Sequence, residues 1–275
     1  MNMIKELTYP EIEKFIPLLE EDPSLNLFFL NDFKLYKIEK DYKVFHTEGL
    51  LMMWFKKTCF VLFSYGEYDS DEVAAFINEK NPLSINGPKK ALFPLEGKLK
   101  GEWETTYTPM MAITKESFIK TVKRSDNLSF LLTYEDFLET AELYSKDKGF
   151  SNGFETEEKR ESWAYGMEEE MEYPYAACGY RVKHKLIGTA YLSAATKESA
   201  MVVGVLVDED WRGGGIGTQL AQEITDIALN DHQIKRLCLF PSGDKAKHIY
   251  SKLGYKEVGD YALFNNLALK SNRDI

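Results

Sequence analysis

Short apolar runs separated by turn residues characterise the first part of this chain. Residues 44–63 are rich in β-branched and aromatic side chains and are interrupted at Glu48-Gly49 and at Lys56-Lys57. This pattern predicts a meander of strands. One further short strand is expected within residues 81–101, and another at residues 110–113.

Segments whose apolar residues recur at helical intervals precede and follow these strands. Thr8-Tyr9-Pro10-Glu11 has the pattern of a capping box and precedes apolar residues at helical intervals. Ser70-Asp71-Glu72 opens a second amphipathic stretch. The amino-terminal half therefore has the pattern of a small α+β unit.

The second half changes from helices to strands and then to a crossover. Two helices are predicted over Thr133–Lys148 and Thr156–Met171, and three antiparallel strands over Tyr175–Lys183, Leu186–Ala195 and Ala200–Val207. A glycine-rich turn then opens a helix, which is followed by a short strand, Leu237–Phe240, and a helix, Lys245–Leu253. A helix between two strands predicts that those strands lie parallel and close together.

The segment between residues 114 and 127 is polar and basic, and it is the expected link between two domains. We predict domains over residues 1–120 and 127–275, since 275 residues exceed the usual size of one domain.

The amino-acid composition limits the classes of partner that the chain is expected to bind. With 44 acidic against 34 basic side chains, the net charge of -10 disfavours nucleic acid and anionic membranes and favours cationic ligands. Three widely separated cysteines predict reduced thiols and no metal site. The longest apolar stretch is interrupted by lysines, and the amino terminus lacks an export signal, so a cytoplasmic location is expected.

Residues 205–218 carry the strongest chemical signal. Four glycines in five positions lead from a strand end directly into a helix. Free backbone amides at such a start, together with the helix dipole, favour a phosphate. A tight turn alone would explain one glycine, but not Arg212 followed by Gly215 and Gly217. The P-loop lysine is absent, and the preceding meander does not fit a Rossmann unit.

This stretch resembles the signature of the GNAT superfamily of N-acetyltransferases, which Arg212, Gly215 and Gly217 match. The resemblance implies an α/β fold: a central mixed, mostly antiparallel sheet with two splayed parallel strands, flanked by helices. It also implies acetyl-CoA as co-substrate. The implied cofactor-binding residues are Leu206 and Val207 for the pantetheine arm, and Arg212, Gly213, Gly214, Gly215, Ile216, Gly217 and Thr218 for the pyrophosphate.

A second motif lies downstream. Residues 246–255 resemble the family's helix that ends in Tyr, two residues and Leu-Gly-Tyr, which makes Tyr250 the implied general acid for the leaving thiolate. For any single tyrosine on a helix, a packing role is the simpler interpretation. Gly243 stands where family members often have an asparagine that contacts CoA, so that contact is missing or moved.

The acceptor is less well defined. Glu155–Glu172 contains eight glutamates in the region that forms one lip of the family's acceptor site. A solvated helix face is the plainer explanation, but a part that faces the cleft would attract a protonated amine. Trp163, Tyr165 and Met167 belong either to the core or to the acceptor pocket, and no general base is assigned.

The element order before residue 114 repeats the order after it without a second glycine cradle. This indicates tandem GNAT-like domains with a degenerate first copy, as in relatives of glycine N-acyltransferase. Two functions follow. One is acetyl transfer from acetyl-CoA to a primary amine of a small molecule or peptide. The alternative is a non-catalytic acyl-CoA-binding or regulatory module, and a longer acyl donor stays open.

Overall fold

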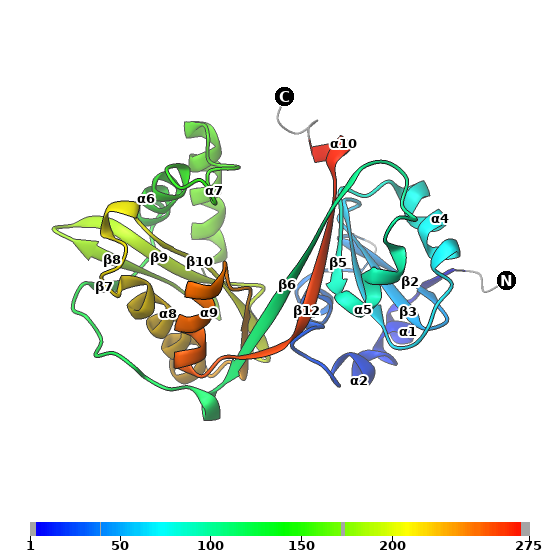
Figure 1. Ribbon diagram of the computed structural model, residues 1–275, viewed down its shortest axis with the longest axis horizontal. Helices are drawn as coiled ribbons and strands as arrows, with labels where there is room; N and C mark the ends of the chain where they lie inside the picture. The colour runs from blue at the N-terminus through cyan, green and yellow to red at the C-terminus, as the bar shows by residue number, and fades with distance from the viewer. Residues whose placement is uncertain (1–3, 39, 172–173, 271–275) are drawn as a thin grey trace. The chain divides into compact units, whose positions relative to one another are not determined.

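The computed structural model describes residues 4–38, 40–171 and 174–270, which form two compact units. Unit 1 comprises the described residues up to Met110 and from Glu257 onward, and unit 2 comprises Met111–Lys256. Each unit has a mixed, mostly antiparallel sheet with helices packed on it (Figure 1).

Unit 1 begins with a strand and three short helices and continues as a meander. Its elements are β1 (Lys5–Leu7), α1 (Tyr9–Glu13), α2 (Ile16–Leu19), α3 (Leu27–Leu35), β2 (Tyr42–Thr47), β3 (Leu50–Phe55), β4 (Cys59–Ser64), α4 (Ser70–Lys80), β5 (Ser84–Pro88), α5 (Lys89–Leu92), a 3-10 turn (Phe93–Leu95), the first part of β6 (Trp103–Thr114), β12 (Lys256–Asn266) and α10 (Leu267–Lys270). The strand order is β1-β2-β3-β4-β5-β12-β6, with β4 and β5 parallel.

The predicted meander over residues 44–63 is confirmed as β2, β3 and β4, with turns at both predicted breaks. The capping box at Thr8 and Glu11 is also present. The first helix ends sooner than its apolar spacing indicated, and Pro17 lies in the first turn of α2. Proline has no amide hydrogen and does not continue a helix through its interior.

Unit 2 contains the crossover. Its elements are the end of β6, a 3-10 turn (Lys115–Ser117), β7 (Leu128–Phe130), α6 (Tyr134–Ser145), α7 (Glu157–Glu170), β8 (Ala177–Val182), β9 (Lys185–Ser193), β10 (Ser199–Val207), a 3-10 turn (Glu209–Trp211), α8 (Ile216–Asp226), a π-helical turn (Ile227–Asp231), β11 (Arg236–Leu239) and α9 (Asp244–Leu253). The strand order is β6-β11-β10-β9-β8-β7. Figure 1 shows α6 and α7 on one face of this sheet and α8 and α9 on the other.

The predicted helices and strands of unit 2 are confirmed within a few residues, and so is the parallel crossover. β10 pairs with β11 over Ser199–Met201 and Arg236–Cys238 in parallel orientation. The strands β8, β9 and β10 form the expected antiparallel meander.

Two long strands lie where sequence periodicity gave little guidance. The last four residues of β6, Met111–Thr114, pair with β11 in unit 2, although the rest of β6 belongs to unit 1. β12 pairs with β5 in unit 1. The domain limits 1–120 and 127–275 stay a prediction; the compact grouping differs from them, since unit 2 includes residues 111–126 and excludes the residues from Glu257 onward. An alternating pattern marks a strand but does not say which sheet receives it.

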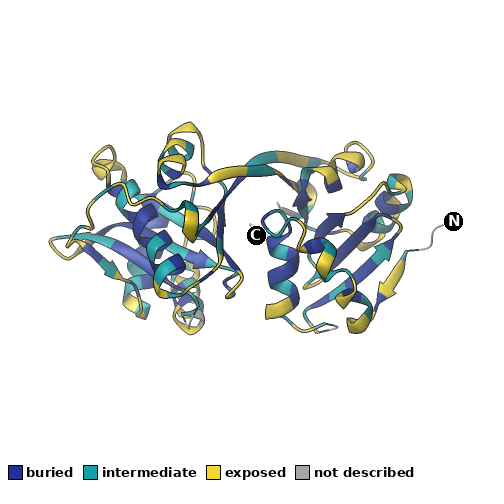
Figure 2. Ribbon diagram, turned by 90° about the horizontal axis from the view of Figure 1, so that it is seen from below, coloured by how far each residue is buried: buried dark blue, intermediate teal, exposed yellow. Residues whose placement is uncertain are grey.

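Each unit has its own buried core, and the strands carry most of it, as the dark blue ribbons in Figure 2 show. In unit 2, α8 and α9 bury apolar residues such as Leu220, Ile224 and Leu253 against the sheet. In unit 1, Val73 and Ile77 of α4 do the same. Among the described residues, no helix combines the length and the apolar character needed to span a bilayer.

Candidate cofactor and active site

The turn between β10 and α8 has the conformation that its glycines permit. Gly213 and Gly215 have φ of 87° and 80°, in the left-handed region that favours glycine. A Cβ atom added at either residue would meet no heavy atom within 4 Å. The conformation therefore calls for glycine, and the space beside the turn is open.

The backbone amides of this turn have no partner within the protein. In the described part of the chain, none of the amides from Gly213 to Thr218 donates a hydrogen bond, and Gln219 is the first to do so, to the carbonyl of Gly215. Gly215 is the N-cap of α8 and has no side chain to accept from these amides. Successive free amides at a helix start, with the positive end of the helix dipole, form an anion-binding site.

The corresponding helix start in unit 1 is already capped. Asp69 precedes α4, and its Oδ1 accepts from the amides of Asp71 at 3.0 Å and Glu72 at 3.1 Å. A carboxylate thus occupies the place that a phosphate would need. The two strand-to-helix turns therefore differ. The Asp69 carboxylate accepts from the first amides of α4, whereas the first amides of α8 are free.

Half of β10 offers an unpaired edge next to the glycine turn. Its pairing with β11 ends at Met201 and Cys238, so residues 202–207 face no described strand on that side. A β-bulge between Val203 and Leu206 bends this half of the strand. An extended ligand with amide groups can pair with such an edge as an added strand would.

Side chains from the end of α6 hold this half of β10. The Tyr144 hydroxyl donates to the Gly204 carbonyl at 3.0 Å. Arg212 Nε donates to the Val207 carbonyl at 3.0 Å, and its guanidinium pairs with the Asp147 carboxylate at 2.5 Å. We call Tyr144, Asp147 and Arg212 the β10 brace. They fix the carbonyls at two points of the open half-strand.

Gly204 fits this arrangement closely. It has φ of 62°, and a Cβ atom there would lie 2.2 Å from the Tyr144 hydroxyl oxygen and from a ring carbon of Tyr191. Tyr144 itself is 1% exposed and stacks on Phe150 with ring centroids 4.9 Å apart. Burial raises its pKa well above the ordinary value, so the hydroxyl stays a donor.

Tyr250 lies on α9 and is 7% exposed. It belongs to the same buried cluster as Ile216 and Leu220 of α8, and its ring meets that of Tyr255 edge-on at 5.5 Å. Burial raises the pKa of Tyr250 to about 12. The side chain is therefore a protonated phenol at neutral pH, packed with the helix that begins at the glycine turn.

A surface hollow of about 440 Å³ lies beside the brace. Its lining consists of Leu143, Lys146, Asp147, Lys148, Lys185, Leu206, Val207, Asp208, Glu209, Asp210 and Arg212. It includes three of the predicted site residues, Leu206, Val207 and Arg212. The glycines and Tyr250 are not among its lining residues, so the predicted site does not form one enclosed cavity.

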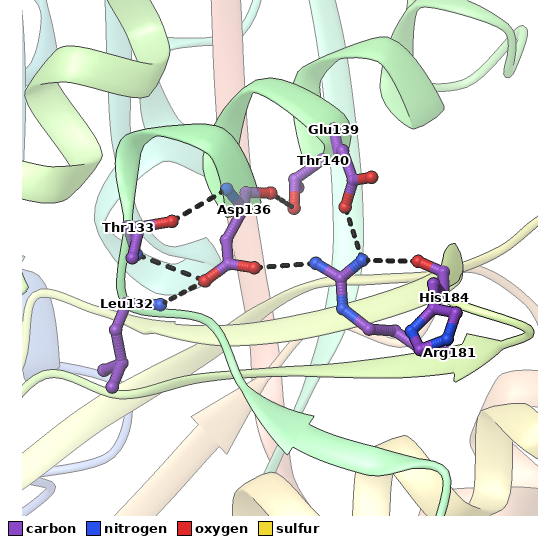
Figure 3. A network of polar contacts seen from close by, with 7 residues as sticks. All are labelled: Leu132, Thr133, Asp136, Glu139, Thr140, Arg181 and His184. Carbon is purple, nitrogen blue, oxygen red and sulfur yellow. Dashed lines mark hydrogen bonds and ion pairs between the residues drawn. The ribbon is translucent and has the colours of Figure 1, made fainter.

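A polar network fixes α6 to the sheet, and with it the brace (Figure 3). Arg181 of β8 pairs with Asp136 at 2.6 Å and with Glu139 at 2.5 Å, and donates to the carbonyl of His184 at 3.0 Å. Burial acts to raise the pKa of Asp136, but amide hydrogen bonds from Leu132 and Thr133 and the Arg181 guanidinium outweigh it and lower that pKa. Asp136 is thus an ionised anchor.

The other residues singled out in the sequence lie in the core or at the surface, away from the glycine turn in the sequence. Trp163 and Met167 pack in the core with Phe137, whereas Tyr165 is 57% exposed. The glutamates at 155, 157, 158, 161, 168 and 169 are exposed or partly so, and Glu172 lies outside the described residues. His232 contacts the carbonyl of Pro174 at 3.0 Å. Among the described residues, no cluster of His, Cys, Asp or Glu could hold a metal ion.

Sequence reasoning missed Tyr144 and Asp147. Both are ordinary residues in an amphipathic helix and the turn after it, and their partners lie 60 and 65 positions further on. Gly204, the only glycine within the β10 run, was the available signal, because a glycine inside a strand often marks a bulge.

Comparison with known proteins agrees with this geometry. Residues 137–255 match the sequence model described as the Acetyltransferase (GNAT) family. No curated protein matches the chain. A GCN5-related N-acetyltransferase from Kribbella flavida is 15% identical, with a TM-score of 0.62 over 87% of this chain and 95% of that one.

Two further solved structures extend the likeness over nearly the whole length. A GCN5-related N-acetyltransferase from Sphaerobacter thermophilus is 13% identical, with a TM-score of 0.63 over 95% of this chain and 94% of that one. A tandem GNAT protein from the clavulanic acid biosynthesis pathway is 10% identical, with a TM-score of 0.56 over 96% and 97%. Identities this low show a shared fold only.

The similarity to the GNAT acetyltransferase family is thus carried by residues 137–255, which lie within unit 2. The predicted fold class is confirmed: a mixed, mostly antiparallel sheet with flanking helices, similar along its length to a tandem GNAT protein.

Proposed function

We propose that unit 2 transfers an acetyl group from acetyl-CoA to a primary amine of a small molecule or peptide. The observation that carries this proposal is the succession of free amides from Gly213 to Thr218, directly after the unpaired half of β10. The amides fit a diphosphate, and the strand edge fits the amide groups of a pantetheine arm. Acetyl-CoA would supply an activated acyl group and a thiolate leaving group.

The protein's own groups would then bind and orient. Backbone amides from Gly213 to Thr218 would hold the diphosphate, and polar backbone groups near Leu206 and Val207 would face the acyl carbonyl. The β10 brace would keep these groups in place, because it fixes the carbonyls of Gly204 and Val207. Preorganised donors stabilise developing negative charge without a cost of reorganisation.

Arg212 would act mainly through its side chain on the strand, not on the phosphates. Its guanidinium is engaged by Asp147 and the Val207 carbonyl, whereas the backbone amides that follow it are free. We therefore assign Arg212 as a positioning residue of the cofactor site.

Tyr250 would donate a proton to the leaving sulfur. Its raised pKa keeps the hydroxyl protonated at neutral pH, and it belongs to the buried cluster that includes residues of α8, the helix that begins at the glycine turn. General acid catalysis of this kind typically contributes ~10²–10⁴-fold to the rate.

The acceptor would be a small amine, favoured by the acidic character of the chain. A subtype similar to glycine N-acyltransferase and a cytoplasmic location belong to the same proposal, and they rest on the resemblance and on composition. Unit 1 would be a degenerate copy without an acyl-CoA site, because Asp69 caps its helix start.

The test measures thiol release from acetyl-CoA with a panel of primary amines, using the wild type and Tyr250→Phe. An enzyme releases CoA only with certain amines, and the variant is slower at equal cofactor affinity. Binding of acetyl-CoA without amine-dependent release in the wild type would favour the non-catalytic module instead.

A further inference from the structure

Unit 1 has a second hollow, of about 530 Å³, on the face of its sheet that α4 also packs against. Glu6 of β1 is paired with Phe45 of β2, and Lys43 of β2 with Trp54 of β3. Directly opposed residues of antiparallel strands share a face, so these four side chains lie together. The hollow is lined by Glu6, Lys40, Asp41, Tyr42, Lys43, Phe45, Trp54, Lys56, Lys57 and Lys80. We call it the lysine hollow.

The charge of this lining opposes that of the whole chain. Five lysines face two acidic residues here, whereas the chain has 44 acidic against 34 basic side chains. Lys43 pairs with Glu6 at 2.8 Å. Lys40, Lys57 and Lys80 form no ion pair with any described residue. A local excess of cations in a concave site concentrates anions.

Aromatic rings form the rest of the lining and hold one of the lysines. The Lys80 ammonium lies 5.7 Å from the ring centroid of Phe45 and 5.4 Å from that of Phe76. Trp54 is 8% exposed and packs on Phe60 with centroids 4.4 Å apart. The floor is therefore rigid and apolar, beneath a cationic rim.

The turn that supplies two of the lysines is conformationally unfavourable for them. Lys56 and Lys57 are the two central residues of the turn Phe55–Thr58 between β3 and β4, which the Thr58 amide closes on the Phe55 carbonyl at 2.9 Å, and they have φ of 45° and 56°. Connections with two left-handed residues strongly prefer Asn-Gly or Gly-Gly. The Lys56 ammonium is held over the rings of Tyr36 and Phe55, at 5.3 Å from each centroid, but Lys57 has no comparable contact among the described residues. Turn chemistry therefore gives no reason for lysine at position 57, whereas a ligand would.

We propose that the lysine hollow binds a small molecule with a chain of phosphate groups, its phosphates beside Lys40, Lys57 and Lys80 and its apolar part against the aromatic floor. A volume of about 530 Å³ is within the size range of small-molecule sites. This binding is separate from acyl transfer and does not depend on it.

The test is calorimetric titration of the full chain in a Gly214→Asp background, which places a carboxylate in the glycine turn of unit 2 and so removes a competing anion site. ATP and inorganic tripolyphosphate are the probes, and adenosine is the control. Tighter binding of ATP would mean that the floor contacts the base, and equal binding would mean that the phosphate chain alone is recognised.

Lys57→Glu combined with Lys80→Glu is expected to weaken binding of both phosphate probes at least about 10-fold. Lys14→Glu with Lys34→Glu, at two exposed lysines of unit 1, has the same change of net charge and should leave affinity within about two-fold. No binding of either probe at 1 mM in the folded protein, at about physiological ionic strength, would overturn the proposal. Equal losses in the two double variants would overturn it too.

Lys57→Gly keeps the proposal testable if the double variant folds poorly. Glycine relieves the left-handed conformation and removes one cation. The midpoint of thermal unfolding should rise while affinity for tripolyphosphate falls. Unchanged affinity would contradict a role for Lys57.

Discussion

Tyr250 combines a buried ring with a hydroxyl that has to be protonated to act as an acid. Its pKa of about 12 is due to burial, and no charged partner opposes that effect. Replacing Tyr250 with phenylalanine is expected to lower kcat about 10²- to 10⁴-fold at unchanged acetyl-CoA affinity, because only the hydroxyl is lost. Steady-state kinetics and calorimetric titration measure the two quantities. Loss of affinity equal to the loss of kcat would instead indicate a packing role.

The pH profile gives a second check on the same residue. A group with a pKa of about 12 stays protonated between pH 7 and about pH 10, so kcat should not fall in that range through ionisation of Tyr250. A decrease with a midpoint near pH 9 that disappears in Tyr250→Phe would contradict the assignment.

The β10 brace makes a different prediction from the glycine turn. Tyr144→Phe leaves the Gly204 carbonyl without its hydroxyl donor, which should cost about 1–3 kcal/mol in the free energy of unfolding. It should also lower kcat while CoA affinity stays within about two-fold, since the amides proposed to bind the phosphates are elsewhere in the chain.

Tyr165→Phe is the matched control for this variant, because Tyr165 is 57% exposed. Its kcat and stability should both be unchanged. A Tyr144→Phe protein with normal kcat would remove the brace from the account of catalysis and leave it a structural contact.

At the scale of single residues, the sequence predicted the glycine turn but not the contacts of the side chains around it. The spacing of Arg212, Gly215 and Gly217 predicted a phosphate-binding turn; the turn has left-handed glycines and free amides, and phosphate binding there stays a prediction. The direction of the Arg212 side chain could not be predicted. It depends on Asp147, which only the folding of α6 against the sheet brings within reach.

At the scale of helices, α4 and α8 differ in whether a side chain caps the backbone amides of the first turn. α4 and α8 both follow a strand in a crossover, but Asp69 caps the first while Gly215 leaves the second uncapped. A capped helix is more stable by about 1 kcal/mol. The start of α8 lacks this stabilisation, and its first amides have no side-chain acceptor.

Helix α3 buries a carboxylic acid. Burial raises the pKa of Asp32 to about 7, with partial opposition from the Lys56 ammonium. In the unfolded chain the value is about 3.9, so the folded state favours the protonated form. The resulting stabilisation is present below about pH 4 and is lost as the pH rises through 7.

Asp32→Asn should therefore remove this pH dependence and raise the free energy of unfolding at pH 8 by about 4 kcal/mol relative to the wild type, since a difference of about 3 pKa units corresponds to that free energy. Urea unfolding at pH 5 and pH 8 measures the effect, with Asp126→Asn at an exposed site as control. A variant that is less stable than the wild type at both pH values would contradict it.

Most elements could be predicted because their periodicity is local. The meander β2–β4 and the helices α6 and α7 have clear turn residues and N-caps. α3 was missed because it is apolar on most sides, with Leu27, Phe29, Leu30 and Phe33 all buried, so it has no polar face to reveal its period.

For the whole molecule, the chain order of the strands does not match their grouping into units. β12 comes after all the elements of unit 2, yet it lies between β5 and β6 in unit 1. Such pairing depends on long-range contacts, and the alternating pattern of residues 256–266 would suit either sheet. This is why the sequence alone does not show which unit receives β12.

Deleting the residues from Glu257 onward should therefore destabilise unit 1 more than unit 2. The truncated chain loses an interior strand of the first sheet, including the buried residues Ala262 and Phe264, whereas α8, α9 and β11 stay intact. Hydrogen exchange is expected to accelerate in β4 and β5 and to stay slow in β9. Faster exchange in β9 than in β5 would contradict the strand assignment.

The most direct test of the central claim is calorimetric titration with acetyl-CoA of the wild type and of Gly214→Asp. Gly214 is outside the left-handed region, and a Cβ atom there would lie 3.8 Å from the Trp211 carbonyl oxygen, so aspartate should fit the backbone while its charge repels a diphosphate. Gly166→Asp, in α7, is the matched control. The account predicts saturable binding in the wild type and in the control, and its loss in Gly214→Asp. Absence of binding in the folded wild type, or equal binding in all three proteins, would contradict an acyl-CoA site at this turn.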